Sequence, residues 1–242
     1  MGRSGLPSTL IICCPLPMGM PQSTAETCLA FGSRTEMPVT WIAPLDRLKH
    51  VAGRSAATGR SPNVALEIPA TASRQELRQL LTRAAAESSG LDAAAIRGPL
   101  PAEYRRMLVD CGIKVVCRDR FDDTTRGSRR PAPRGWPCRS TLWGLWEVTR
   151  NTATPPGLVS RLVPWGCQPG AVAGGLTVLD VGGQEPVTDA APILGRIERW
   201  RSWAERRNNT AGQVAFASLS DLPALIAGAG RLPVGGSVLK AA

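Results

Sequence analysis

Histidine is almost absent from this chain of 242 residues, which contains only one, His50. This scarcity excludes a metal or acid–base site built from several histidines, because imidazole is the common zinc ligand and the side chain that titrates near neutral pH. We place His50 on the surface of a helix whose buried stripe is formed by Leu45, Leu48 and Ala52.

Long apolar runs and paired cysteine motifs are also missing. No segment approaches the roughly 18 apolar residues of a transmembrane helix. We interpret the short run from Leu10 to Cys14 as a strand rather than a secretion signal, because Pro15 and Pro17 break it. The seven cysteines include no CxxC pair, which indicates reduced thiols rather than a disulfide framework. These absences predict a cytoplasmic protein with no membrane partner.

Arginine is abundant where lysine is scarce. The formal net charge is +10, and only three of the 29 basic residues are lysines. Such a charge favours acidic partners, although a solvated arginine-rich surface explains it more simply. The densest basic segment, rich in Pro and Gly, runs from about 119 to 138, and we predict it to be a long loop. In and beside it lie Arg118, Arg120, Arg126, Arg129, Arg130, Arg134 and Arg139.

Short apolar runs alternate with segments of helical periodicity along the chain. The predicted strands are Leu10 to Cys14, Val39 to Ala43, Val64 to Ile68, Ala93 to Arg97, Ile113 to Cys117, Thr141 to Val148, Leu176 to Leu179 and Val214 to Ala217. One of the helices between them begins with Ser73 and Glu76 in capping-box spacing. This alternation indicates an α/β fold with a parallel sheet. We therefore predict one domain, residues 1–242, with a (β/α) barrel of about seven to eight parallel strands.

In such barrels the functional residues lie at the carboxyl ends of the strands. Here those ends carry Cys14, Glu67, Arg97, Asp119, Glu147 and Asp180. A catalytic thiol at Cys14 needs a nearby base, and a buried structural cysteine is the commoner case. A zinc site from Cys13, Cys14 and Cys117 is disfavoured, because adjacent strand residues point to opposite faces.

The strand-end carboxylates leave two interpretations open. Two carboxylates at a suitable separation can hydrolyse a glycoside as acid and base or nucleophile. Pairing with arginine is their commoner role, and Arg97 is the evident partner. On the second interpretation, we expect Arg97→Ala to destabilise or reshape the mouth of the barrel.

Tryptophans gather around the sixth predicted strand, beside the basic loop. They could stack on sugar rings, although core packing is the commoner role of tryptophan. The candidate binding residues from the loop and this strand are Arg126, Arg129, Arg130, Arg134, Trp136 and Trp143.

Several segments follow one another in the order of a known family. They are IICCPLP (Ile11 to Pro17), MPVTWIA (Met37 to Ala43), ALEIPA (Ala65 to Ala70), Arg97-Gly98-Pro99 and Leu176 to Asp180. They resemble segments of the NodB-homology polysaccharide deacetylases. The first two resemble the Thr-Phe-Asp-Asp-Gly-Pro motif and the second-strand signature of that family. The third resembles the Glu-Ile before its metal-binding histidines, the fourth its Arg-x-Pro motif and the last its Leu-His strand. The resemblance covers almost the whole chain and implies a deacetylase-like barrel.

The departures from this family concern its metal site. There, an aspartate pair supplies a base and a metal ligand, two histidines complete the site, and a late histidine is an acid. Here Cys13, Cys14 and Pro15 replace the aspartates, Pro69 to Ser73 contains no histidine, and Leu179 or Asp180 stands at the late histidine. Because a divalent ion needs several converging ligands, the resemblance implies that metal-dependent hydrolysis is lost.

We therefore predict a catalytically inactive deacetylase-like protein, without metal or cofactor, that is a binding or scaffolding module for a glycan or acidic partner. One alternative is a divergent carbohydrate-active hydrolase that uses strand-end carboxylates. Another is a polyanion-binding protein that uses the arginine-rich loop, with nucleic acid as the less favoured partner because no helix-turn-helix, zinc-finger or RNA-binding sheet motif is present.

Overall fold

The computed structural model describes residues 8–35, 37–58, 63–88, 90–98, 100–119, 136–141, 144–152, 175–182, 188–210 and 213–229. The strands are β1 (Ser8–Pro15), β2 (Val39–Ala43), β3 (Val64–Ile68), β4 (Ala93–Ile96), β5 (Val115–Arg118), β6 (Cys138–Ser140), β7 (Trp146–Thr149), β8 (Asn151–Thr152), β9 (Leu176–Asp180) and β10 (Val214–Ala217). The helices are α1 (Gln22–Thr35), α2 (Leu45–Thr58), α3 (Arg74–Glu87), α4 (Ala102–Asp110), α5 (Ala191–Thr210) and α6 (Leu222–Ala229). Among these helices, none combines the length and the apolar character needed to cross a membrane.

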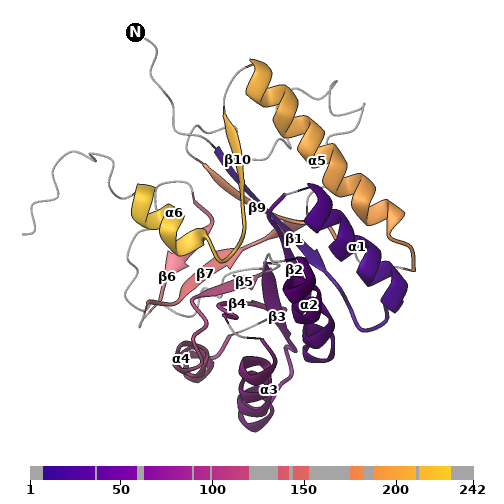
Figure 1. Ribbon diagram of the computed structural model, residues 1–242. Helices are drawn as coiled ribbons and strands as arrows, with labels where there is room; N and C mark the ends of the chain where they lie inside the picture. Colours follow the sequence, from indigo (N-terminus) through magenta and orange to yellow (C-terminus); the bar gives the residue numbers. More distant parts are fainter. Residues whose placement is uncertain are drawn as a thin grey trace, which may run out of the picture.

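The strands form one curled sheet surrounded by helices (Figure 1). Its order is β6-β7-β5-β4-β3-β2-β1-β9-β8, and β10 pairs with the first half of β1. Every ladder is parallel except that between β6 and β7. The predicted α/β barrel is thus confirmed in the form of a half-barrel.

Side chains of alternate strand residues enter two separate apolar layers. The outer layer lies between the sheet and α1 to α5, and Trp200 of α5 is buried in it. The inner layer covers the other face of the sheet and includes Cys13, Cys117 and Leu222. The hydroxyl of Ser220 donates to Asp92, just before β4, so that α6 packs on the inner layer near the amino ends of the central strands. The carboxyl ends remain as the mouth of the half-barrel.

The predicted strand from Thr141 to Val148 is wrong in its bounds and in its number of strands. β6 ends before Thr141, and β7 begins only at Trp146. The two short strands pair antiparallel, with Arg139 opposite Glu147. Between them Gly144 has a φ of +83°, a backbone conformation that glycine adopts without steric cost. This turn reverses the chain, and a regular strand cannot continue through it.

Helix α3 begins with the predicted capping box. The Ser73 side chain accepts from the Glu76 N–H, and the Glu76 carboxylate accepts from the Ser73 N–H. These bonds lower the pKa of Glu76. We expect Ser73→Ala to lower the free energy of unfolding by about 1 kcal/mol in urea denaturation, because one amide at the helix start loses its acceptor. Thr82→Ala on the same helix is the control, and an equal loss there would show that the cap has no special role, since Thr82 only bonds back to the Arg78 carbonyl.

Candidate functional site

Arg150 lies at the mouth of the half-barrel. It follows β7 directly, and its N–H donates to the Arg118 carbonyl at 2.9 Å, which extends the β5–β7 ladder by one step. Its guanidinium Nε donates to Oδ1 of Asp119 at 2.8 Å, and Nη1 lies 3.2 Å from Oδ2 of Asp180. The Arg150 side chain is only 3% exposed. One permanent cation therefore links the carboxylates that follow β5 and end β9.

The turn after β9 fixes the position of Asp180. Oδ1 of Asp180 accepts from the Gly182 N–H at 2.9 Å. A Cβ at Gly182 would lie 2.1 Å from Cγ of Pro15, so only glycine allows this approach of β9 to the end of β1. Asp180 is also the register partner of Cys13. The local sequence thus brings a carboxylate and a thiol to the same place.

Two thiols lie beneath the guanidinium, on the inner face of the sheet. Cys13 and Cys117 are both completely buried. A hydrogen bond with Cys117 and burial raise the pKa of Cys13, whereas the charge of Arg150 opposes the rise. Burial alone would lower the pKa of Arg150, but Cys117, Asp180 and Asp119 raise it overall. We call these five residues the Arg150 cluster.

The chemistry open to the Arg150 cluster follows from its charges. A guanidinium stays protonated and has no acceptor, so Arg150 pairs with both carboxylates and accepts no proton itself. Its planar donors suit carboxylates and other oxygen acceptors. In the part of the chain that the structure describes, no group of three or more His, Cys, Asp or Glu side chains is placed to hold a metal ion.

Two of the predicted mouth residues do not face the mouth, which corrects the prediction for Cys14 and Glu147. The Cys14 thiol lies in the outer layer, where burial and the nearby Cys28 of α1 raise its pKa. Glu147 is also on the helix-facing side, bonded to Arg105 of α4. The reason is the period of two along a strand: neighbours such as Cys13 and Cys14 point to opposite faces.

Glu147 is the acceptor in a second buried cluster, the Glu147 cluster, formed with Arg105, Arg118 and Arg139. Oε1 accepts from Nε of Arg105 at 2.6 Å. Oε2 lies 2.6 Å from Nη2 of Arg139 and 3.5 Å from Nη1 of Arg118. No atom of the Glu147 side chain reaches solvent. This carboxylate therefore holds β5, β6, β7 and α4 together, and we assign it a structural role.

Glu67 and Arg97 form the predicted ion pair, with 3.7 Å between Oε1 and Nε. The Arg97 side chain is 55% exposed, however. Exposed pairs of this kind contribute less than about 1 kcal/mol. The prediction that Arg97→Ala destabilises or reshapes the mouth is therefore corrected: we expect this substitution to change the stability only slightly.

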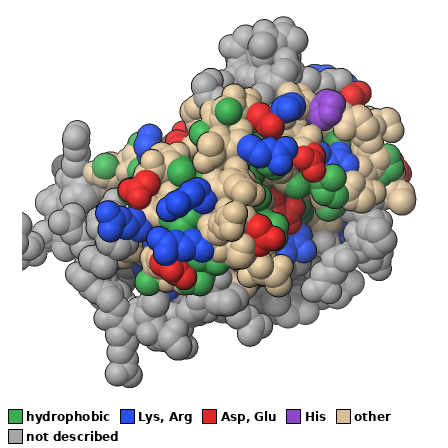
Figure 2. Space-filling view, turned by 90° about the horizontal axis from the view of Figure 1, so that it is seen from below, with side chains coloured by type: hydrophobic (Ala, Val, Ile, Leu, Met, Phe, Trp, Pro, Cys, Tyr) green, Lys and Arg blue, Asp and Glu red, His purple; other side chains and the backbone are tan. Residues whose placement is uncertain are grey.

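The remaining predicted residues divide between described and undescribed parts of the chain. Trp136 is half-buried against the inner layer, beside Cys138. His50 is exposed on α2, as expected, and is the purple side chain in Figure 2. On that face basic and acidic side chains are interspersed. The predicted binding residues Arg126, Arg129, Arg130, Arg134 and Trp143 lie outside the described residues.

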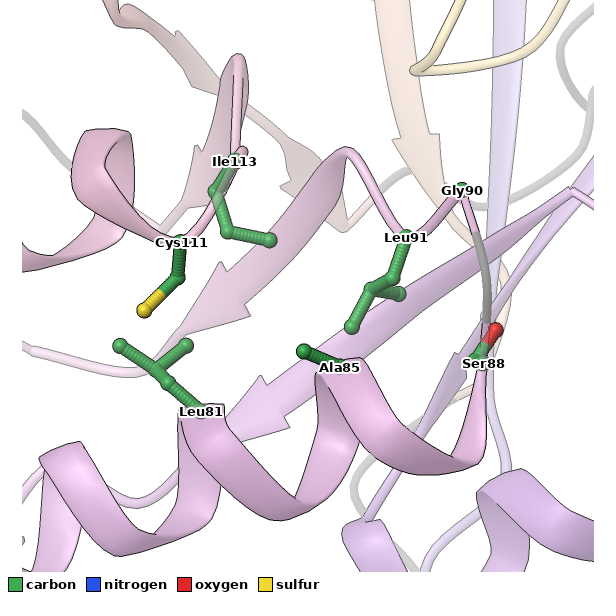
Figure 3. Close-up of a pocket in the computed structure, with 7 residues that line it drawn as sticks. All are labelled: Leu81, Ala85, Ser88, Gly90, Leu91, Cys111 and Ile113. Atoms are coloured by element: carbon green, nitrogen blue, oxygen red, sulfur yellow. The ribbon is translucent and has the colours of Figure 1, made fainter.

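A small cavity of about 110 Å³ lies away from the mouth, between α3 and the segments that enter β4 and β5 (Figure 3). Leu81, Leu91 and Ile113 line it together with Cys111, whose pKa is raised mainly by burial. Its position at the amino ends of the strands is typical of residues that serve stability in barrels. We therefore place the functional site at the Arg150 cluster.

Sequence reasoning missed Arg150, the residue that organises the mouth. Its position in the sequence could have indicated it, because Arg150 follows an apolar strand, as Asp119 and Asp180 do. The sequence also pointed to Cys14 instead of Cys13 as the residue at the mouth. The reason is that β1 is buried on both faces and shows no alternation of polar and apolar residues.

No protein-family profile matches the sequence, and no curated protein matches it. Solved structures do resemble it. A Mycobacterium smegmatis protein provisionally assigned as a polysaccharide deacetylase superposes with a TM-score of 0.50 at 13% identity, over 100% of this chain and 97% of that one. A family 4 carbohydrate esterase of Streptomyces lividans, in complex with acetate, gives 0.43 at 11%, over 88% and 98%. A family 4 pseudoenzyme of Bacillus anthracis gives 0.45 at 10%, over 90% and 66%.

At such low identity the likeness concerns the path of the backbone and the order of its elements. The likeness in fold rests on the Mycobacterium smegmatis structure, which matches this chain over its entire length. The sequence landmarks and the curled parallel sheet agree with it. The chain has the α/β barrel fold of a polysaccharide deacetylase.

Proposed function

We propose that this chain is a non-catalytic protein with a deacetylase-like barrel that binds an acidic glycan at its mouth. The observation that supports the loss of catalysis is the position of Arg150 between Asp119 and Asp180. Both carboxylates at this point of the mouth already have a cation as their partner. That cation is part of the chain and cannot be lost to solvent.

The residues at the mouth do not fit the divalent ion that the family resemblance implies. Cys13 lies in the segment that replaces the aspartate pair, and Leu179 or Asp180 lies at the position of the late histidine. The Arg150 guanidinium lies 3.2 Å from Asp180, and its charge acts to lower the pKa of Cys13. A divalent cation placed there would be repelled by Arg150 and would have to displace it from two carboxylates.

The charge and the attachment of the basic segment support an acidic ligand. The arginine-rich segment leaves the described structure at Asp119, after β5, and returns at Trp136, before β6. Its second end is also at the mouth, because the Pro137 carbonyl accepts from the Thr149 N–H at the end of β7. The net charge of the whole chain is +10, and such a charge favours carboxylated or sulfated sugars as ligands.

Metal analysis and a deacetylation assay test the loss of catalysis. We expect the purified full chain, incubated with zinc, cobalt or nickel and then desalted, to retain no stoichiometric ion. We also expect it to release no acetate from N-acetylglucosamine oligosaccharides. Stoichiometric metal together with acetate release above a heat-inactivated control would contradict the proposal.

Titration with oligosaccharides tests the binding role. We expect binding of uronate-containing oligosaccharides that weakens as salt rises, and no binding of neutral oligosaccharides of the same length. A DNA duplex of matched charge is the competitor that separates glycan recognition from general polyanion binding. Equal affinity for the duplex and the acidic glycan would exclude the glycan-specific role, as would binding of the neutral oligosaccharide alone.

A further inference from the structure

Arg47, in the first turn of α2, differs from the other buried arginines that the structure describes. Those arginines pair with carboxylates of the Glu147 cluster or the Arg150 cluster. Arg47 is also buried, with only 8% of its surface exposed, but it forms no ion pair with any described residue. Because a buried charge without a counter-ion strongly destabilises a protein, such charges are normally paired. The counter-ion of Arg47 is not among the described side chains.

The guanidinium of Arg47 has hydrogen-bond partners on only one of its nitrogens. Nη2 donates to the Met18 carbonyl at 3.0 Å and to the Met20 carbonyl. Nε and Nη1 are buried, and neither has a hydrogen-bond partner in the described part of the chain. Arginine donates only, so these N–H groups require an acceptor from outside the guanidinium. Buried donors of this kind in a folded protein indicate a bound water molecule or ion.

The backbone around Arg47 favours negative charge. Arg47 is the third residue of α2, at the end of the helix where the backbone dipole is positive and where a cation is disfavoured. Met20 lies two residues before α1, a second helix of 14 residues, which has no acidic side chain in its first turn. The first N–H groups of a helix have no partner within the helix. A buried cation and the starts of two helices thus lie close together.

The carboxylates on α2 and on the neighbouring α3 have other partners. Asp46 lies 3.9 Å from Arg83 of α3, and both side chains are exposed. Glu87 of α3 lies 3.3 Å from Nζ of Lys49. These acidic side chains therefore do not compensate the charge of Arg47.

We propose that Arg47 and the starts of α1 and α2 form a binding site for one chloride ion. A chloride ion supplies the negative charge and accepts hydrogen bonds from several N–H groups, whereas a water molecule supplies no charge. Because Nε and Nη1 are not exposed to solvent, the site suits a monatomic anion better than phosphate or sulfate. The bound ion stabilises the contact of α2 with the loop between β1 and α1. The site includes no residue of the Arg150 cluster.

Thermal unfolding of the full chain in two salts tests the proposal. The buffers have equal ionic strength, one with sodium chloride and the other with sodium gluconate, whose anion is too large to be enclosed. We expect a melting temperature about 3 °C or more higher in chloride, because a ligand that binds only the folded state stabilises it. Equal ionic strength keeps the general screening of the +10 charge the same in both buffers.

Two variants assign the chloride effect to Arg47. Arg47→Met keeps most of the side-chain volume and removes the donors, so its melting temperature should be the same in both salts. Arg83→Met removes an exposed guanidinium and should keep the full rise in chloride. The proposal would be overturned if Arg47→Met kept the rise of the wild type. It would also be overturned if both variants lost the rise equally, because the effect would then come from the overall charge.

A crystal of the wild-type chain soaked in sodium bromide gives a measurement that does not depend on the folding of a variant. We expect an anomalous peak of bromide next to Nε or Nη1 of Arg47. A water molecule or a protein carboxylate at this position, without bromide, would contradict the proposal. None of these readouts involves a glycan or a deacetylation assay, so their outcome is independent of the proposed function.

Discussion

Replacing Glu147 by glutamine is expected to lower the free energy of unfolding by about 3 to 5 kcal/mol. Glu147 is completely buried and accepts from Arg105 and Arg139, with Arg118 within ion-pair distance. Glutamine keeps the size of the side chain but loses the charge, and its amide nitrogen cannot accept a hydrogen bond. Three guanidiniums then remain close together without their shared anion. Urea denaturation followed by circular dichroism measures this loss.

The control for Glu147→Gln is the same substitution at a solvent-exposed carboxylate that also pairs with an arginine. Glu205 on α5 accepts from Nε of Arg201 at 3.0 Å, and both side chains are exposed. Glu205→Gln should therefore change the free energy of unfolding by less than about 1 kcal/mol. In the double variant Glu147→Gln with Arg139→Gln, part of the loss should be recovered, because one uncompensated charge is removed. A loss below about 1 kcal/mol for Glu147→Gln alone would show that other groups neutralise these arginines.

The second large effect is expected from Arg150→Met, which removes the cation of the mouth and keeps most of the side-chain volume. Asp119 and Asp180 then lack the cation that lies between them, and Asp180 is only 14% exposed. We expect a loss of about 2 to 3 kcal/mol, smaller than for Glu147, because Asp119 is half exposed and water compensates it. Thermal unfolding at neutral pH gives the measurement.

Two further variants separate loss of charge from loss of packing at Arg150. Adding Asp180→Asn to Arg150→Met should recover part of the stability, because the more buried carboxylate no longer needs a cation. Arg201→Met, which removes an exposed guanidinium, should have little effect. If Arg150→Met were as stable as the wild type, the ion pairs at the mouth would not contribute to folding. Arg150 would then not be held at this position by its two carboxylates.

The fold could be predicted from the sequence to a large extent. Strands such as Val39–Ala43 and Val64–Ile68 have the predicted bounds, because short apolar runs between turns have few alternatives. The capping box of Ser73 and Glu76 is local chemistry and was confirmed. The prediction failed between Thr141 and Val148, where the turn at Gly144 precedes β7, so that only Trp146 to Val148 of this segment are in a strand.

The candidate site could be predicted only in part. Asp119 and Asp180 were correctly placed at the carboxyl ends of strands, and both lie at the mouth. Cys14 and Glu147 were assigned to the wrong face. In a sheet buried on both sides, the residues that point to either face are apolar. The strand is then a continuous apolar run, and its pattern does not tell which residues face inward.

The sequence by itself determined the order of strands and helices, the scarcity of imidazole and the excess of arginine, since these follow from composition and local periodicity. Only the tertiary structure decided which charges meet. Arg150, which follows β7, joins Asp119 after β5 to Asp180 at the end of β9, because the parallel sheet curls. Such contacts depend on strand order and curvature, which bring residues from separate strands together and leave no trace in any short segment.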